Sequence, residues 1–342
     1  MRFKLIVVSV LLLIAAYSVF WFQIADKVEQ DTLAWIEKSK NSAEGVKVFV
    51  GDLTVSGFPY KIAVEASSIN ATLPAGLYNS QSISLMIPEI AVVYQPWQAT
   101  HAIVVTDYFD AVIGSLDAPE VSLNFDQVKS SVILDPDTFK LDNLSIVAEK
   151  ISWQKASETS SMESAELHLR KSLSGMENAS TFDLPINQAV FFKAYNADIN
   201  EFKATILGQN ADEIKLEAFL HANQLPDFTK SSLSAWRDDG GTLSIKTFEY
   251  GTTNNHVGLS GDVTLDENLK PLGAFDAKLS GLENIMGALS QNENVSGTAK
   301  LSLQSQLQNN TEMKDIPISI SMQNGMMYVG PIPLMELEPI IP

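Results

Sequence analysis

The side chains that could carry acid–base or metal chemistry are spread thinly along this sequence. Its histidines stand at four scattered positions: His101, His168, His221 and His256. None pairs with another at the spacing of a zinc site, and none has acidic residues arranged around it like a set of metal ligands. Asp135 and Asp137 could offer oxygens to calcium, but no glutamate completes a binding loop of the EF-hand kind. We expect an Asp-Pro-Asp turn there and no bound metal.

Motifs for nucleophilic or cofactor chemistry are also missing. Gly258–Gly261 begins like the nucleophile elbow of a hydrolase, but it lacks the second spacer residue and lies in a strand-like pattern. The absence of cysteine excludes thiol catalysis, disulfides and cysteine-ligated metals. No phosphate-binding loop or dinucleotide fingerprint is present, so we expect no cofactor. Two carboxylates far apart in the chain could still meet in the fold, as in glycoside hydrolases, and the sequence leaves that alternative open.

The composition indicates a folded and acidic protein. The 342 residues include 41 acidic and 23 basic side chains, which give a formal charge of −18, and 45% of the residues are hydrophobic. Because this much negative charge repels phosphate backbones, nucleic acid is excluded as a partner. The length suits one large domain or two ordinary ones, with a core that needs neither disulfides nor metals.

The N-terminus predicts a membrane anchor. The stretch Leu5–Ile24 follows Arg2 and Lys4, has no charged residue and would span about 30 Å as a helix, which is the thickness of a bilayer core. A cleaved signal peptide would need small residues at its cleavage site, whereas Ala15 and Ala16 lie inside the apolar run. We therefore expect a retained single-pass anchor in a bacterial inner membrane, with the short tail inside and the body in the periplasm.

The pattern changes after the apolar run. Aromatic rings near its end, including Tyr17 and Trp21, suit the headgroup layer of the membrane. An apolar stripe at helical spacing then predicts a helical stalk. We assign residues 1–25 to a transmembrane signal-anchor, 26–44 to the stalk and 45–342 to a β-rich periplasmic body, with a soft division near 157–180.

Beyond residue 45 apolar and polar residues alternate, which is the period of half-buried strands. The first alternating residues are Val46, Val48, Val50, Tyr60, Ile62 and Val64. Similar runs follow at Ile83–Ile87, Ile90–Tyr94, Val121–Phe125, Leu144–Ile151, Ala165–Leu169, Ile214–Leu220, Leu243–Tyr250, Val257–Leu265, Leu272–Leu279, Ala299–Leu303, Ile316–Met322 and Met326–Val329. Helical spacing in this region is limited to Thr106–Ile113, Pro226–Arg237 and Leu282–Leu289.

Short strands joined by short turns favour antiparallel pairing over a parallel α/β fold. We therefore predict a mainly β fold, an extended antiparallel sheet system that is either a curled sheet or a sandwich, with few short helices after the N-terminal transmembrane helix. A sheet with one apolar face must pair with another sheet or curl on itself, which leaves a core or a groove. The candidate ligand groove is assigned to four residues of the first strands: Val48, Tyr60, Ile62 and Val64.

Several short motifs predict particular local structures. Gly57–Pro59 favours a hairpin corner that buries two rings, because proline holds the residue before it extended. Asn324–Gly325 suits a tight hairpin, and Pro331 and Pro333 suit an edge where the sheet ends. Trp236 is expected to anchor the core.

The same motifs carry a family resemblance. With their neighbours they form four stretches: Val55–Tyr60, Trp236–Leu243, Leu259–Asp266 and Asn324–Leu334. In this order, and behind a membrane helix, the stretches resemble a family of uncharacterised alphaproteobacterial envelope proteins known as a domain of unknown function, over nearly the whole chain. The resemblance supplies no catalytic residues. A more remote, fold-level similarity links the anchor and the amphipathic strands to AsmA-type proteins, which are associated with lipid traffic and outer-membrane assembly.

These observations favour a non-enzymatic envelope protein over an enzyme. The membrane is its partner through Leu5–Ile24, and the sheet would present an apolar concavity to lipid or another hydrophobic ligand, or would aid the assembly of envelope proteins. One alternative is a scaffolding subunit that binds a protein partner through a sheet edge. A second alternative is a hydrolase with a dispersed site.

Overall fold

A computed structural model describes most residues of the chain. The chain folds into two compact units. The described residues are 2–41, 45–75, 81–171, 184–203, 207–227, 229–252, 255–280, 297, 301, 316–330 and 332–341. The first unit comprises Met1–Leu141 and Ile146–Glu158, and the second comprises Asp142–Ser145 and Thr159–Pro342. Each unit is built around an antiparallel sheet, which confirms the predicted mainly β fold.

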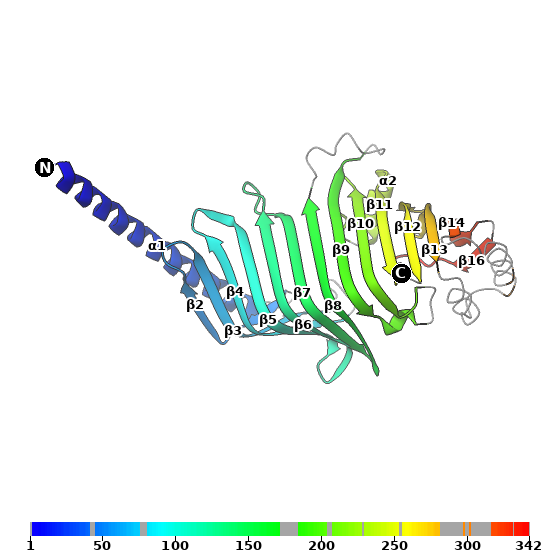
Figure 1. Cartoon of the computed structure of the whole chain (residues 1–342), viewed down its shortest axis with the longest axis horizontal. Coiled ribbons are helices and arrows are strands. Elements are labelled where there is room, and N and C mark those ends of the chain that lie inside the picture. Colours follow the sequence, from blue (N-terminus) through cyan, green and yellow to red (C-terminus); the bar gives the residue numbers. More distant parts are fainter. Residues whose placement is uncertain are drawn as a thin grey trace. The chain divides into compact units, whose positions relative to one another are not determined.

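One long helix, α1 (Arg2–Lys40), begins the first unit. The predicted span and the predicted stalk are therefore parts of a single helix (Figure 1). Its apolar part is long and hydrophobic enough to cross a membrane, a test that a signal sequence near an N-terminus also meets. Most side chains of its first four turns are exposed, as expected for a surface that is not covered by protein.

The described part of the first unit contains a sheet of seven strands: β1 (Lys47–Phe49), β2 (Asp52–Ser56), β3 (Ile62–Leu73), β4 (Ile83–Gln95), β5 (Gln98–Ser115), β6 (Ala118–Leu134) and β7 (Leu141–Lys155). Their order is β1-β3-β4-β5-β6-β7, and β2 pairs with β3 beside β1. From β3 onward each strand pairs with the next one in the chain, as expected for strands joined by hairpins (Figure 1).

The described residues of the second unit form nine strands and two short helices. The strands are β8 (Glu158–Lys171), β9 (Ile186–Asp198), β10 (Asn210–His221), β11 (Thr242–Gly251), β12 (His256–Leu265), β13 (Pro271–Ser280), β14 (Ile316–Gln323), β15 (Met326–Val329) and β16 (Ile332–Glu336). The helices are η2 (Asn200–Phe202), a 3₁₀ turn, and α2 (Lys230–Asp238). The strands pair in chain order. Asn324 and Gly325 have φ of +53° and +70° between β14 and β15, which confirms the predicted tight hairpin.

Several long strands contain a point where the alternation shifts by one residue. In β3 the shift falls at Ser68, whose φ is +52°, and in β6 it falls at Gln127, whose φ is +49°. Ala66 and Ile69 are an odd number of residues apart, and yet both contribute to one cluster on the same face of β3. Irregularities of this kind bend a strand, and the strands of the first unit are visibly curved in Figure 1.

The same shift accounts for one wrong prediction. Thr106–Ile113 is not a helix, because it lies inside β5. Val104 and Ala111 stand opposite Val92 and Leu85 of β4, so both lie on the apolar face despite an odd separation. A one-residue shift brings apolar residues to helical spacings. A corresponding shift in β4 explains why the sequence pattern shows two separate runs within this one strand.

The other predicted helices had different outcomes. Pro226–Arg237 is helical over most of its length as α2, where Thr229 caps the N-terminus by accepting a hydrogen bond from the Ser232 N–H. Leu282–Leu289 lies outside the described residues, as does all of the predicted strand Ala299–Leu303 except one residue. The strands β5, β9 and β16 were not predicted.

The Gly57–Pro59 corner joins β2 to β3, as expected, but it does not bury two rings. Gly57 has a φ of +108°, and a Cβ at this position would lie 2.6 Å from the Lys61 carbonyl oxygen, so glycine is required. Phe58 is 46% exposed and Tyr60 is 76% exposed. Phe58 is only half-buried, because its partners are the Trp21 and Phe22 rings of α1 rather than the core of the sheet.

Candidate functional site

The sheet of the first unit has one apolar face and one polar face. A row that runs through four paired strands on the apolar face consists of Ala71, Leu85, Ala111 and Leu123. The adjacent row, on the opposite face, consists of Asn70, Met86, Asp110 and Asn124. Because paired residues point to the same side of a sheet, the contrast between these rows separates the two faces.

The helix α1 covers the part of this apolar face nearest the chain's start. Trp21 and Ala25 are buried against Ile62, which is 0% exposed, with Val64 partly buried beside them. The helix therefore serves as the second layer that covers the apolar face over β2 and β3. We call this group the Trp21 cluster.

Two backbone contacts fix α1 on the sheet. The Trp21 Nε1–H donates to the Lys61 carbonyl oxygen at 3.1 Å, and the Tyr17 hydroxyl donates to the Pro59 carbonyl oxygen. The Phe58 ring stacks on Phe22 at 5.5 Å between centroids and meets the Trp21 ring edge-on at 5.4 Å. The aromatic residues that were expected to mark a membrane interface thus also bind the β2–β3 corner.

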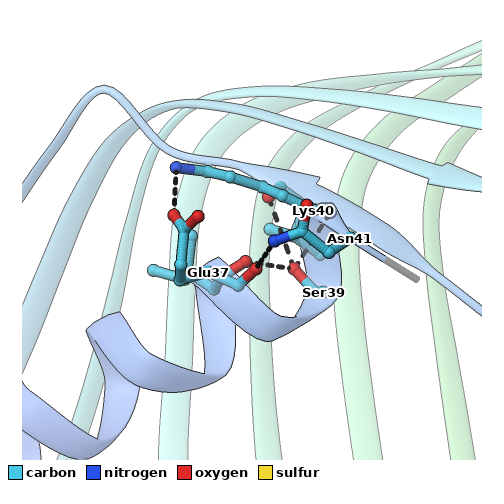
Figure 2. Close-up of polar contacts among 6 residues, drawn as sticks. Glu37, Ser39, Lys40 and Asn41 are labelled. Atoms are coloured by element: carbon cyan, nitrogen blue, oxygen red, sulfur yellow. Dashed lines mark hydrogen bonds and ion pairs between the residues drawn. The ribbon is translucent and has the colours of Figure 1, made fainter.

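The far end of α1 is tied to β1. The Val48 N–H donates to Ser39 Oγ at 3.3 Å, and Ser39 Oγ in turn donates to the Ile36 carbonyl oxygen at 2.7 Å (Figure 2). Glu37 pairs with Lys40 at 3.3 Å in the same turn. Val48 itself is buried with Ile69 and Ala71.

The four residues of the predicted groove therefore do not form one open surface. Val48 and Ile62 are buried in two closed clusters, and Val64 is partly buried beside Ile62. Tyr60 is exposed on the β2–β3 corner rather than on the sheet face. In this structure neither Val48 nor Ile62 is accessible to a ligand.

The apolar face continues beyond these clusters across β5 and β6. Val104, Phe109, Leu123 and Phe125 lie on it and are half-buried. Phe109 and Phe125 stand opposite each other, and their rings stack at 4.5 Å between centroids. We call these four residues the open apolar face, because their side chains are partly accessible, whereas the central side chains of the Trp21 cluster are buried.

The sheet of the second unit repeats this separation of faces. One row that crosses it is apolar at every position: Leu167, Phe192, Leu216, Phe248, Leu259, Ala277 and Ile318. The neighbouring row on the other face is Glu166, Lys193, Lys215, Glu249, Gly258, Lys278 and Pro317. Lys193 pairs with Glu213 at 2.9 Å, as expected on a solvated face.

Two elements of the second unit close parts of its apolar face. Trp236 of α2 packs with Leu233, Leu265 and Leu269, which confirms its predicted role as a core anchor. Its Nε1–H donates to the His221 carbonyl oxygen at 3.0 Å. Farther along the sheet, Leu337 is buried in a cluster with two other side chains: Phe275 and Met322.

The histidines make isolated contacts. His101 Nε2 lies 3.0 Å from Ser131 Oγ on the polar face of the first unit. His168 Nδ1 lies 2.9 Å from Ser145 Oγ, and its Nε2 lies 3.5 Å from Glu166 Oε2. Ser145, His168 and Glu166 are connected as in a Ser–His–acid triad. However, the imidazole is partly exposed to solvent, and its contact with the carboxylate is long.

Two hollows lie on the polar faces. The one in the first unit has a volume of about 380 Å³ and includes four carboxylates: Asp52, Glu65, Glu89 and Asp107. The one in the second unit has a volume of about 550 Å³ and includes Lys246 and Lys278. Within the described residues no group of three or more acidic or histidine side chains could hold a metal ion.

Two buried titratable groups of the second unit have displaced pKa values. Burial raises the pKa of Tyr250 to about 12, and its hydroxyl donates to the Gly208 carbonyl oxygen at 2.7 Å. Burial lowers the pKa of His221, although the nearby Leu184 carbonyl oxygen opposes that shift. Tyr250 pairs with Ile214 and His221 pairs with Thr242, at opposite ends of the β10–β11 ladder, so the two groups do not form a catalytic pair.

Comparison with protein families places the chain in a bacterial group. The sequence profile of an uncharacterized protein conserved in bacteria, DUF2125, matches residues 21–338. The chain belongs to the DUF2125 family. Comparison with curated proteins finds no match. The matched part of this DUF2125 member begins at Trp21, the residue that joins α1 to the sheet, and includes both apolar faces.

Proposed function

We propose that this DUF2125 protein is a non-enzymatic, inner-membrane-anchored protein of the bacterial envelope that binds the acyl chains of lipids on its apolar sheet faces. The observation that carries the proposal is the open apolar face, where Val104, Leu123 and Phe125 are half-buried while neighbouring clusters are closed. An amphipathic sheet gains stability only when its apolar face is covered, and acyl chains are flexible enough to cover a curved surface.

The contacts between the N-terminal helix and the sheet support a retained anchor. Trp21 is 3% exposed because the body of the protein buries it against Ile62. Removal of the apolar run would take Trp21 and Tyr17 out of these contacts and uncover the β2–β3 corner. A helix that is both a membrane span and part of the core places the apolar face beside the lipids that it would bind.

The test compares two adjacent residues of β6 that point to opposite faces. Leu123→Glu puts a charge on the open apolar face, whereas Ser122→Glu puts the same charge on the polar face, and both side chains are half-buried. Native mass spectrometry of the full-length protein extracted from membranes would measure the lipid that remains bound. We expect Leu123→Glu to lose bound lipid while Ser122→Glu and the unmutated protein keep it.

Two results would replace the proposal. Absence of lipid from the unmutated protein, together with a protein captured at a sheet edge, would favour the scaffolding alternative. Labelling of Ser145 by a fluorophosphonate probe, and loss of that labelling in a His168→Ala variant, would favour the hydrolase alternative, because the probe reacts only with an activated serine.

A further inference from the structure

Three hairpin tips lie at one end of the first unit's sheet. The β2–β3 corner precedes Ile62, and Ile62 pairs with Tyr94 at the end of β4. The β4–β5 turn follows directly, and the start of β5 pairs with the end of β6, as in the pair His101 and Ile133. The β6–β7 turn therefore projects from the same end, and the three turns follow one edge in Figure 1.

Every one of these tips presents an exposed aromatic ring. Tyr60 is 76% exposed on the first tip, Trp97 is 63% exposed on the second, and Phe139 is 66% exposed on the third. Phe58 adds a second, half-exposed ring to the first tip. Because these rings lie at turns, they cannot pack into the core of the sheet. Their apolar surface therefore either contacts a non-aqueous phase or remains exposed to water.

The position of α1 identifies that phase. Tyr17 and Trp21, which bind the first tip at Pro59 and Lys61, belong to the apolar run that is long enough to span a bilayer. When α1 crosses a membrane, the β2–β3 corner must lie at the depth of the last two turns of the apolar run Leu5–Ile24. That depth is the headgroup layer, where tyrosine and tryptophan rings are most stable.

The polar groups of the tips fit the same layer. Lys61 and Lys140 are exposed beside the rings and could reach anionic headgroups. The Asp135 carboxylate is engaged within its own turn, where it accepts hydrogen bonds from the Thr138 N–H at 2.7 Å and the Thr138 hydroxyl at 2.7 Å. Asp137 remains as the exposed carboxylate of the three tips.

We propose that the rings of Tyr60, Trp97 and Phe139 insert into the headgroup layer of the membrane that α1 crosses, so that this end of the sheet rests on the lipid surface. The inference depends on the retained anchor in the proposed function and adds the site at which lipid passes between the bilayer and the apolar face. Acyl chains would then move along the sheet face without crossing water, which is the costly step for a lipid.

The chain lacks cysteine, so single nitroxide labels can be placed cleanly. Trp97→Cys and Phe139→Cys report on the proposed membrane end, and Leu116→Cys is the matched control, because Leu116 is 60% exposed on the β5–β6 turn at the opposite end. The labelled full-length proteins are reconstituted into vesicles of phosphatidylethanolamine and phosphatidylglycerol. Collision with oxygen, which concentrates in lipid, is compared with collision with a water-soluble nickel chelate.

We expect the ratio of oxygen to nickel accessibility to be several-fold higher at positions 97 and 139 than at position 116. Equal ratios at the three positions would overturn the inference, and so would labels at 97 and 139 that neither reagent reaches. Melting curves of the three variants should match the unmutated protein, since each replaced side chain is exposed.

The outcome separates this inference from the proposed function. Bound lipid in a protein whose tips contact water would overturn the inference alone. Tips in lipid, in a protein that retains no lipid on its apolar face, would overturn the proposed function alone. A mature protein that lacks α1 would overturn both.

Discussion

Both units close part of an apolar sheet face with a helix-borne tryptophan. In the first unit the Trp21 Nε1–H donates to the Lys61 carbonyl oxygen at 3.1 Å, and in the second the Trp236 Nε1–H donates to the His221 carbonyl oxygen at 3.0 Å. Each indole is nearly buried. In both units a large ring covers apolar surface while its N–H group forms a hydrogen bond.

The surroundings of the two rings differ. Trp236 has buried neighbours, and a Cβ added to Gly241 would lie 2.2 Å from its Nε1 atom, so the space around it is filled. Trp21 contacts Phe22 and Phe58, which are about half exposed. Trp236 therefore completes a closed core, whereas Trp21 joins the core to a surface that the proposed membrane position would cover.

The largest test of this comparison is a charge in the Trp21 cluster. Ile62→Glu buries a carboxylate at a fully enclosed position and should cost on the order of 5 kcal/mol of unfolding free energy, because no residue of the cluster carries a positive charge. Ile62→Val should cost only about 1 kcal/mol. Hydrogen exchange should locate the loss of protection in α1, β2 and β3. Unchanged stability would mean that this cluster opens to water.

The next effect is truncation of the tryptophan in the second unit. Trp236→Ala removes the ring from a filled core and should cost about 4 kcal/mol, whereas Trp236→Phe, which loses chiefly the hydrogen bond to the His221 carbonyl oxygen, should cost about 1 kcal/mol. Exchange should increase in α2 and in the strands beneath it, β10 and β12. Equal effects of the two substitutions would show that the hydrogen bond, not the ring, stabilises this core.

The smallest effect is a pH dependence that arises from His221 in the second unit. Burial holds the pKa of His221 below its ordinary value of 6.5, so the unfolded chain takes up a proton before the folded protein does. The protein therefore keeps its full free energy of unfolding above pH 6.5 and loses part of it as the pH falls below that value. The slope of unfolding free energy between about pH 7 and pH 5 should be smaller in a His221→Asn variant. An identical slope in both proteins would assign the pH dependence to other groups.

Much of this architecture follows directly from local sequence patterns. The uncharged run Leu5–Ile24 predicted the apolar part of α1, and the alternation of apolar and polar residues predicted most strands of both units. Asn324–Gly325 predicted its hairpin because both residues accept a positive φ. These features depend on neighbouring residues, so the sequence alone contains the information.

Other features depended on contacts that the sequence does not display. Alternation shows that Ile62 and Leu123 face the apolar side, but it does not show that α1 covers the first and leaves the second half-buried. The shift of alternation in β5 had the same origin, since it is fixed by pairing with β4 and β6 rather than by local preference.

The sequence by itself determined that this protein has an apolar helix, amphipathic strands and aromatic residues at turns. Only the tertiary structure decided which apolar residues became core and which remained open, because that depends on contacts between Tyr17 and Pro59 and between Trp21 and Lys61. Residues so distant in the chain meet only after hairpins have brought the sheet together. A pattern can therefore assign a side chain to a face, whereas the covering of that face is a property of the whole fold.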